Sequence, residues 1–255
     1  MFAAEALTAD TLLDGRVHLA QPRRGYRAAI DPVLLAAFVP ARLGARVLDL
    51  GCGAGAAALC LAARVPSLDL HGLELQAGYA ALARTNAAAN GVALAVHDGD
   101  VRQPPAALRA LSFDQVMANP PFHDPSAAAG PDPGRDRALR EGEATLADWI
   151  DAGLRRLVPG GTLVLVHRPD RLSAILAALA GRAGAVELLP VGPREDAPAT
   201  RLLLRATKGS GGSLRIWPPL TLHEGRTGMA ASPAYTAAAQ EVLRGMAALG
   251  PATNG

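Results

Sequence analysis

The sequence lacks the features that would place it in a membrane, in an exported class or in a metal-binding class of proteins. Hydrophobic residues make up 50% of the 255 positions, but no apolar run approaches the length that crosses a bilayer. The start carries Glu5, Asp10 and Asp14 where a signal sequence would be basic. The two cysteines, Cys52 and Cys60, have neither CxxC spacing nor accompanying histidines. We therefore expect a cytoplasmic protein with no membrane partner, no metal site and no disulfide.

The chain also has little excess of charge of either sign. It has 25 Lys and Arg against 23 Asp and Glu, and Lys208 is the only lysine among the basic residues. A net charge of +2 does not indicate a polyanionic partner, although an isoelectric point near 8.8 permits one. Composition and charge therefore leave the partner and the oligomeric state open.

What the chain has instead is a regular alternation of two kinds of segment between residues 46 and 208. Short β-branched or leucine-rich runs, typical of buried parallel strands, alternate with longer Ala- and Leu-rich stretches that predict helices. Strands are predicted over residues 46–50, 69–74, 94–97, 113–118, 162–167, 186–191 and 201–206. Helices are predicted over residues 55–63, 77–89 and 146–157. Thr145 and Asp148 predict a capping box before the third helix, and Pro159-Gly160-Gly161 predicts a turn after it.

This alternation predicts an α/β fold with a doubly wound sheet of seven mostly parallel strands and short additions at both ends. We divide the chain into an N-terminal extension (1–44), a central ligand-binding domain (45–208) and a C-terminal tail (209–255) that packs on the domain. The Gly/Ser-rich residues 209–213 predict a flexible link. In the tail, Ser232 as N-cap, Pro233 at the first helical position and Gly245 near the end predict a helix. Ligands of such sheets bind at the carboxyl ends of the strands.

The first motif at such an end is Val47-Leu48-Asp49-Leu50-Gly51-Cys52-Gly53-Ala54-Gly55, in which a strand leads through a glycine-rich turn into a helix. Glycines permit a positive φ and let the backbone pass close to a ligand, while N–H groups at the helix start face an anionic group. The spacing of Gly51, Gly53 and Gly55 is G-x-G-x-G, which differs from the G-x-G-x-x-G of dinucleotide sites. Asp49 fits a ligand with an ammonium group and would repel a pyrophosphate. The alternative is a turn that serves packing alone.

Two further acidic residues lie at or just after the ends of the next two predicted strands. Glu74 ends its strand about 20 residues past the glycine turn, where such folds bind the hydroxyls of a ribose. Asp100 lies one strand later, where a carboxylate can accept a hydrogen bond from the amino group of an adenine. Each residue taken alone is explained as a solvated loop acid. Together with Asp49, they place three acids at successive strand ends and favour a nucleotide-like ligand.

A proline-rich motif, Asn119-Pro120-Pro121-Phe122, directly follows the fourth predicted strand. The prolines fix the backbone and leave carbonyl groups without a local N–H, so the Asn119 side-chain oxygen and the Pro120 carbonyl can both accept from one NH₂ group. Such a pair orients the nitrogen lone pair and stabilises the charge that develops on nitrogen when it attacks. Phe122 offers a face for stacking on a planar base. The alternative is an ordinary proline turn that ends a strand.

Together these motifs resemble a known family. The glycine-rich turn is similar to motif I of the seven-stranded class I S-adenosylmethionine-dependent methyltransferases, and Asn119-Pro120-Pro121-Phe122 resembles motif IV of their amino-methylating branch. The run Tyr26-Arg27-Ala28-Ala29-Ile30-Asp31-Pro32-Val33-Leu34-Leu35 resembles the N-terminal segment of the bacterial tRNA1(Val) adenine N6-methyltransferases, which have a methyltransferase small domain. The resemblance covers nearly the whole chain, since it includes residues 141–146, the Pro159-Gly160-Gly161 turn, and residues 220–224 and 235–236.

The resemblance implies S-adenosylmethionine as the cofactor and the N6 amino group of an RNA adenine as the methyl acceptor. Because that family modifies the base just 3′ of the tRNA anticodon, the implied partner is tRNA. The implied cofactor-binding residues are Asp31, Asp49, Gly51, Gly53, Gly55, Glu74 and Asp100. The implied catalytic residues, which would hold the target amino group and stack on the flipped base, are Asn119, Pro120, Pro121 and Phe122.

Other interpretations stay open. Many adenine methylators of this kind have tyrosine where Phe122 stands, and Asn-Pro-Pro-Phe-His-Asp also resembles the rRNA guanine N2-methyltransferases. Asn-Pro-Pro also serves methylation of a glutamine side chain in release factors, but that enzyme carries tyrosine after the prolines and a helical N-terminal domain. A non-catalytic RNA-binding module that kept the fold is the least consistent interpretation, because the acidic residues and Asn119 are all intact.

Arginines cluster in two regions of the sequence. They can contact RNA phosphates, or they can form a solvated surface, because acidic residues interleave with the arginines of the second region. The first cluster, in the N-terminal segment, comprises Arg16, Arg23, Arg24 and Arg27. The second cluster, in the Pro/Gly-rich loop after residue 122, comprises Arg135, Arg137 and Arg140.

Overall fold

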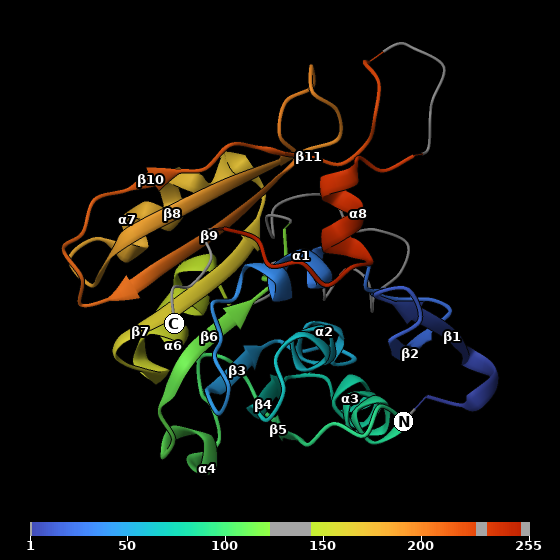
Figure 1. Cartoon of the computed structure of the whole chain (residues 1–255). Coiled ribbons are helices and arrows are strands. Elements are labelled where there is room, and N and C mark those ends of the chain that lie inside the picture. Colours follow the sequence, from blue (N-terminus) through green and yellow to red (C-terminus); the bar gives the residue numbers. More distant parts are fainter. Residues whose placement is uncertain (1, 123–143, 228–233, 251–255) are drawn as a thin grey trace.

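A nine-stranded sheet forms the centre of the computed structural model, which describes residues 2–122, 144–227 and 234–250 (Figure 1). Its strand order is β10-β8-β9-β7-β6-β3-β4-β5, with β11 paired to β8. Neighbouring strands run parallel except where β9 pairs with β7 and β8. The main strands are β3 (Arg46–Leu50), β4 (Asp69–Glu74), β5 (Leu94–Asp98), β6 (Phe113–Ala118), β7 (Leu157–His167), β8 (Ala183–Gly192) and β9 (Arg201–Lys208). The short strands are β10 (Arg215–Ile216) and β11 (Leu220–Thr221).

Helices cover both faces of the sheet, as the predicted doubly wound fold requires (Figure 1). Side chains alternate along each strand, so Val164 packs with the helices of one face while Leu163 and Leu165 pack with those of the other. One face carries α1 (Asp31–Phe38), α2 (Ala56–Arg64), α3 (Ala77–Ala89) and α8 (Ala237–Leu243). The other carries α4 (Ala106–Arg109), α6 (Leu146–Arg156) and α7 (Leu172–Leu179). Short 3₁₀ turns are η1 (Ala4–Ala6) and η2 (Pro169–Arg171).

The N-terminal residues form a separate two-stranded hairpin, β1 (Leu7–Leu12) with β2 (Val17–Pro22). Asparagine side chains on α3 attach it to the domain: Asn86 and Asn90 each accept from one β2 backbone N–H and donate to a β2 carbonyl. All residues of α1 are buried, because α1 lies against α2 and α8 as well as the sheet. These contacts fix the hairpin and α1 beside the carboxyl ends of the central strands.

The seven predicted strands are all present, and two details of the predicted sheet are wrong. β7 begins at Leu157, so Pro159-Gly160-Gly161 lies within a strand and not in a turn. Its pairing with β6 jumps from Phe113↔Leu157 to Gln115↔Thr162, and this bulge accommodates Gly160 at φ +77°. The sheet also has two more strands than predicted, because β10 and β11 of the tail pair with β8.

The other corrections concern the tail. The expected flexible link at residues 209–213 is held by backbone hydrogen bonds, from Gly209 N to Arg182 O and from Ala185 N to Gly212 O, both 2.8 Å. The tail helix begins at Ala237 with Thr236 as its N-cap, while Ser232 and Pro233 lie outside the described residues. In the described part of the chain, no helix has the length and apolar character of a membrane span.

The capping box predicted before α6 is confirmed. Thr145 Oγ1 accepts from the backbone N–H of Asp148, and Asp148 Oδ2 accepts from the backbone N–H of Thr145 at 2.8 Å. Replacing Thr145 with alanine should lower the free energy of unfolding by about 1 kcal/mol, because one N–H of the first turn loses its acceptor. Urea unfolding measures this loss. Thr145→Ser should stay near wild type, and equal losses in both variants would contradict the capping role.

Candidate functional site

A cavity of about 800 Å³ lies at the carboxyl ends of β3, β4 and β6. Its size falls within the range of small-molecule sites. Besides most of the predicted site residues, it is lined by side chains of the segment before α1 and of α6. The predicted site residues that line it are Asp49, Gly51, Gly53, Glu74, Asp100, Asn119 and Pro121.

The glycine-rich turn between β3 and α2 forms one wall of the cavity. Gly51, Gly53 and Gly55 have φ values of +67°, +54° and +89°, which side chains rarely permit. A Cβ on Gly51 would also run into the indole ring of Trp149. Gly51 and Gly53 line the cavity, whereas Gly55 is the N-cap of α2 behind it. At Gly51 and Gly53 the turn therefore presents backbone without a side chain to the cavity.

Asp49 is a buried carboxylate at this wall, with 3% of its surface exposed. Its Oδ2 has no hydrogen-bond partner among the described residues. Burial raises the pKa of this carboxyl to about 8, with a further increase from Glu74, while the backbone N–H of Ala58 opposes the shift. A buried carboxylate with a free oxygen is stabilised by a cationic ligand group.

Glu74, at the end of β4, ties the glycine turn to the neighbouring strand. Its Oε2 accepts from Gly53 N at 2.9 Å and its Oε1 from Gln76 N at 2.8 Å. Burial raises the pKa of this carboxyl, while these backbone N–H groups oppose the shift. Each oxygen keeps a lone pair for a further donor, so the carboxylate can hold the turn and a ligand hydroxyl together.

Asp100 lies at the cavity but is held by a cation. Arg102 Nη2 pairs with Asp100 Oδ2 at 2.8 Å, and this side-chain interaction holds the pKa of the carboxyl below its usual range. Arg102 lines the cavity as well. The expected adenine acceptor therefore shares its oxygens with an arginine that the sequence analysis did not single out.

Asn119 follows β6 and faces the segment before α1. Its Nδ2 donates to the hydroxyl of Tyr26 at 3.2 Å. Its Oδ1 is buried and accepts no hydrogen bond from the described residues. A buried acceptor without a donor costs about 1–3 kcal/mol, so this oxygen is suited to a donor that arrives with a ligand.

Phe122, Asp31, His167 and Arg201 form a second group next to this motif, outside the cavity lining. The rings of Phe122 and His167 meet edge to face at 5.1 Å, and the Arg201 guanidinium lies 5.7 Å from the centre of the Phe122 ring. Arg201 also donates to Asp31 Oδ1 at 2.8 Å. Burial lowers the pKa of His167 to about 4, and Arg171 adds to the shift. The structure thus links Asp31 to Phe122 through Arg201, and neither Asp31 nor Phe122 lines the cavity.

Comparison with known proteins identifies the family. The family model described as methyltransferase small domain matches residues 29–187. The tRNA1(Val) (adenine(37)-N6)-methyltransferase of Yersinia pseudotuberculosis is 31% identical over 76% of this chain and 77% of its own length. This chain belongs to the methyltransferase small domain family.

Solved structures agree with this assignment. A predicted O-methyltransferase from Agrobacterium tumefaciens superposes with a TM-score of 0.69 at 31% identity, over 86% of this chain and 97% of that one. The 16S rRNA N2 G1207 methyltransferase of T. thermophilus, solved with AdoMet and guanosine, has a TM-score of 0.54 at 22% identity, over 79% and 50% of the two chains. The second likeness concerns the fold alone.

The methyltransferase uses S-adenosylmethionine and is an N-methyltransferase. Its cavity fits this cofactor on two observations. The unpartnered Asp49 oxygen can receive the ammonium of a methionine group, and the absence of side chains at Gly51 and Gly53 leaves space for that group beside the turn. Within the described residues, the methyltransferase has no group of three or more His, Cys, Asp or Glu that could hold a metal ion.

Some residues of the methyltransferase site were missed by sequence reasoning. Tyr26 lines the cavity and contacts Asn119, and it lies in the segment that carried the family resemblance, so that segment held a usable signal. Trp149 lines the cavity from the interior of α6 and packs against Gly51, a contact that no local pattern reveals.

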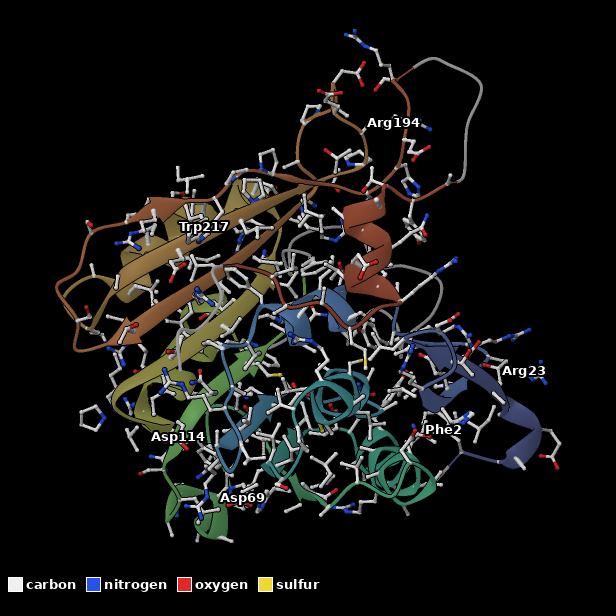
Figure 2. All side chains as sticks on the ribbon, in the orientation of Figure 1. Phe2, Arg23, Asp69, Asp114, Arg194 and Trp217 are labelled. Atoms are coloured by element: carbon white, nitrogen blue, oxygen red, sulfur yellow. The ribbon has the colours of Figure 1, made fainter. Side chains whose placement is uncertain are left out.

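The arginines of the two clusters differ in their contacts and in their exposure to solvent. Arg16 and Arg27 make internal contacts, to backbone carbonyls and to Asp10 respectively. Arg23 and Arg24 are exposed, and Arg23 (Figure 2) also donates from Nε to the Glu5 carbonyl at 2.9 Å. Arg135, Arg137 and Arg140 lie outside the described residues. Phosphate contact thus stays a prediction, with Arg23 and Arg24 as its exposed candidates among the described residues.

Proposed function

We propose that this methyltransferase transfers a methyl group from S-adenosylmethionine to the N6 amino group of an adenine in RNA, in the anticodon loop of a tRNA. The observation that carries the proposal is the buried Asn119 Oδ1, an acceptor without a donor among the described residues, directly before two prolines of which the second, Pro121, lines the cavity. The names of the Yersinia relatives support adenine N6 and tRNA as the acceptor.

The proposed mechanism rests on positioning. Bound S-adenosylmethionine supplies a methyl group made electrophilic by its sulfonium. Asn119 Oδ1 and the Pro120 carbonyl accept from the two N–H bonds of the target amino group, which turns its lone pair away from the aromatic ring. The same oxygens stabilise the positive charge that develops on nitrogen. Phe122, fixed by His167 and Arg201, offers its remaining surface to the flipped base.

The cofactor-binding roles follow the geometry of the cavity. We assign the ammonium of the methionine group to Asp49. Gly51 and Gly53 let the backbone approach the methionine group closely, while their own N–H groups stay bonded to the Leu73 carbonyl and to Glu74 Oε2. Glu74 keeps lone pairs for the ribose hydroxyls, and Asp100 can receive the adenine amino group once Arg102 shares or leaves it. Gly55 acts through the turn, and Asp31 through its pair with Arg201, because neither lines the cavity.

A hydroxyl acceptor fits this site less well. The Agrobacterium structure is described as a predicted O-methyltransferase, but methylation of a hydroxyl requires a group that removes its proton. The amide and carbonyl oxygens at residues 119 and 120 cannot take up a proton at neutral pH. An amino nitrogen can attack with its own lone pair, so the site favours nitrogen.

Two other amino groups are alternative methyl acceptors: guanine N2 in rRNA and a glutamine side chain in a release factor. Guanine N2 in rRNA is favoured by Phe122, which stands where adenine methylators often have tyrosine. A release-factor glutamine is disfavoured, because the described N-terminal residues form a β-hairpin and not a helical domain.

The decisive experiment offers methyl-labelled S-adenosylmethionine together with bulk tRNA, bulk rRNA or release factor, and then identifies the modified unit. We expect N6-methyladenosine in tRNA. N2-methylguanosine in rRNA, or methylglutamine in release factor, would replace the proposed acceptor. Calorimetry in parallel should detect binding of S-adenosylhomocysteine and none of NAD, and the reverse pattern would contradict the cofactor assignment.

A further inference from the structure

Tyr26 makes a contact that the proposed mechanism does not yet use. Its hydroxyl accepts a hydrogen bond from Asn119 Nδ2 at 3.2 Å, across 93 positions of sequence. An asparagine amide carries a donor and an acceptor on its two branches. Binding Nδ2 to Tyr26 therefore decides which way Oδ1 points.

The electrostatics around Tyr26 favour this orientation of the amide. Burial raises the pKa of the Tyr26 hydroxyl, and the charges of Asp31 and Asp49 raise it further, so the hydroxyl keeps its proton. The charge of Asp31, joined by that of Asp49 when a cationic ligand keeps Asp49 ionised, attracts the hydroxyl hydrogen. The oxygen lone pairs are then left for a donor, and Asn119 presents Nδ2 and not Oδ1.

Contacts from α3 and from the N-terminal hairpin hold the backbone at Tyr26 in place. Tyr79 Oη donates to the Tyr26 carbonyl at 3.1 Å. On the following residues, Arg27 pairs with Asp10 at 2.8 Å, and Ala28 N donates to Gln21 Oε1 at 2.6 Å. The backbone is therefore fixed at Tyr26 and at the next two residues, and this holds the Tyr26 hydroxyl against Asn119.

We propose that Tyr26 is a positioning residue, which orients the Asn119 amide so that Oδ1 faces the target amino group. The inference rests on the proposed role of Asn119 as the acceptor for that group. Without Tyr26 the amide can turn, and in the turned state it would present two N–H donors to an amino group that also donates. Part of the enzyme would then hold substrate unproductively.

The first test is Tyr26→Phe, which keeps the ring and removes the hydroxyl. A lost hydrogen bond worth about 1 kcal/mol corresponds to a fall in kcat of roughly fivefold to tenfold. The KM for S-adenosylmethionine and the affinity for S-adenosylhomocysteine should stay within about twofold. Tyr235→Phe is the matched control, because Tyr235 stacks on His223 in the tail, and it should behave as wild type. A wild-type kcat for Tyr26→Phe would overturn the proposal.

The second test asks whether Tyr26 acts through Asn119. In the Asn119→Ala background, Tyr26→Phe should cause no further loss of kcat, because there is no amide left to orient. The same proportional loss in both backgrounds would also overturn the proposal. A wild-type rate for Asn119→Ala alone would instead reject the proposed function, so the two failures are distinguishable.

A measurement without catalysis completes the test. The side-chain amide NMR signal of Asn119, assigned by its disappearance in Asn119→Ala, should shift in Tyr26→Phe bound to S-adenosylhomocysteine. It should keep its wild-type position in Tyr235→Phe. An unshifted signal in Tyr26→Phe would show that Tyr26 does not determine the state of the amide, and the proposal would fall.

Discussion

Replacing Asn119 with alanine should slow methyl transfer about a hundredfold at saturating substrates. The interaction removed is one that strengthens as positive charge appears on the attacking nitrogen, so its loss falls mainly on kcat. By analogy with loss of one oxyanion-hole donor, the cost is roughly 3 kcal/mol. Affinity for S-adenosylhomocysteine should barely change, because Asn119 is assigned to the acceptor and not to the cofactor.

Single-turnover assays on tRNA measure this rate without interference from product release. Asn90→Ala provides a matched control, since Asn90 bonds to the hairpin and does not line the cavity. It should retain wild-type transfer. If Asn119→Ala methylates tRNA as fast as the wild type, the amino-methylation mechanism is wrong.

Asp49→Asn should weaken S-adenosylhomocysteine binding about a hundredfold or more. The substitution removes the buried partner of the ligand ammonium while keeping the shape of the side chain, and loss of one member of a buried ion pair costs about 3–5 kcal/mol. Calorimetry with the purified protein measures this loss. Asp98→Asn is the control, because Asp98 is an exposed carboxylate paired with Arg84 outside the cavity. Equal affinity of wild type and Asp49→Asn would remove Asp49 from the cofactor site.

The pH dependence of binding follows from the raised pKa of Asp49. Without ligand this carboxyl has a pKa of about 8 and is protonated below that pH. An ammonium ligand requires the ionised form, so binding at pH 6 should release a proton, and affinity should rise with pH up to about 8. Above that, an α-amino group with a pKa of about 8 loses its own charge and affinity should fall. Asp49→Asn should lack the rising part of this profile.

The same substitution should stabilise the protein without ligand at alkaline pH. A carboxyl whose pKa is raised in the folded state binds protons more tightly when folded, so it makes the protein less stable as pH rises from the unfolded value of 3.8 to about 8. Asparagine cannot ionise and escapes this loss. The melting temperature of Asp49→Asn should therefore exceed that of wild type at pH 8.5, and the advantage should shrink towards pH 4. A variant that melts lower at both pH values would contradict the buried-charge explanation.

Much of the fold could be read from the sequence because its strands are buried on both faces. β3, β4 and β6 begin and end where their apolar runs do, and α3 runs over the predicted residues 77–89. β7 was harder, because its first residues pair through a bulge next to glycines that usually mark a turn. The tail helix was predicted too early in the chain, because it begins at Ala237, where the Thr236 side chain accepts from the backbone N–H of Ala239.

The candidate site likewise contains some residues that the sequence predicts and others that it does not. Asp49 and Glu74 lie at the ends of their strands and Asn119 directly follows β6. The rule that ligands bind at the carboxyl ends of strands therefore predicted that these residues lie close together, as they do in the fold. Arg102 on Asp100 was not foreseen, because a pair two residues apart in a loop depends on the local path of the backbone. Tyr26 was not foreseen as a partner of Asn119, because a hydrogen bond across 93 positions leaves no periodic trace in the sequence.

Among the described residues, all those that line the cavity lie between Gln21 and Trp149, although the sheet continues through β8, β9 and the tail. Mutations in the last hundred or so residues can therefore accumulate without touching the chamber that holds the cofactor. Those residues reach the acceptor side through Arg201, which lies over Phe122. During divergence, such a layout lets the last hundred or so residues change the packing around Phe122, while the earlier part of the chain keeps both the cofactor-binding side chains and Asn119.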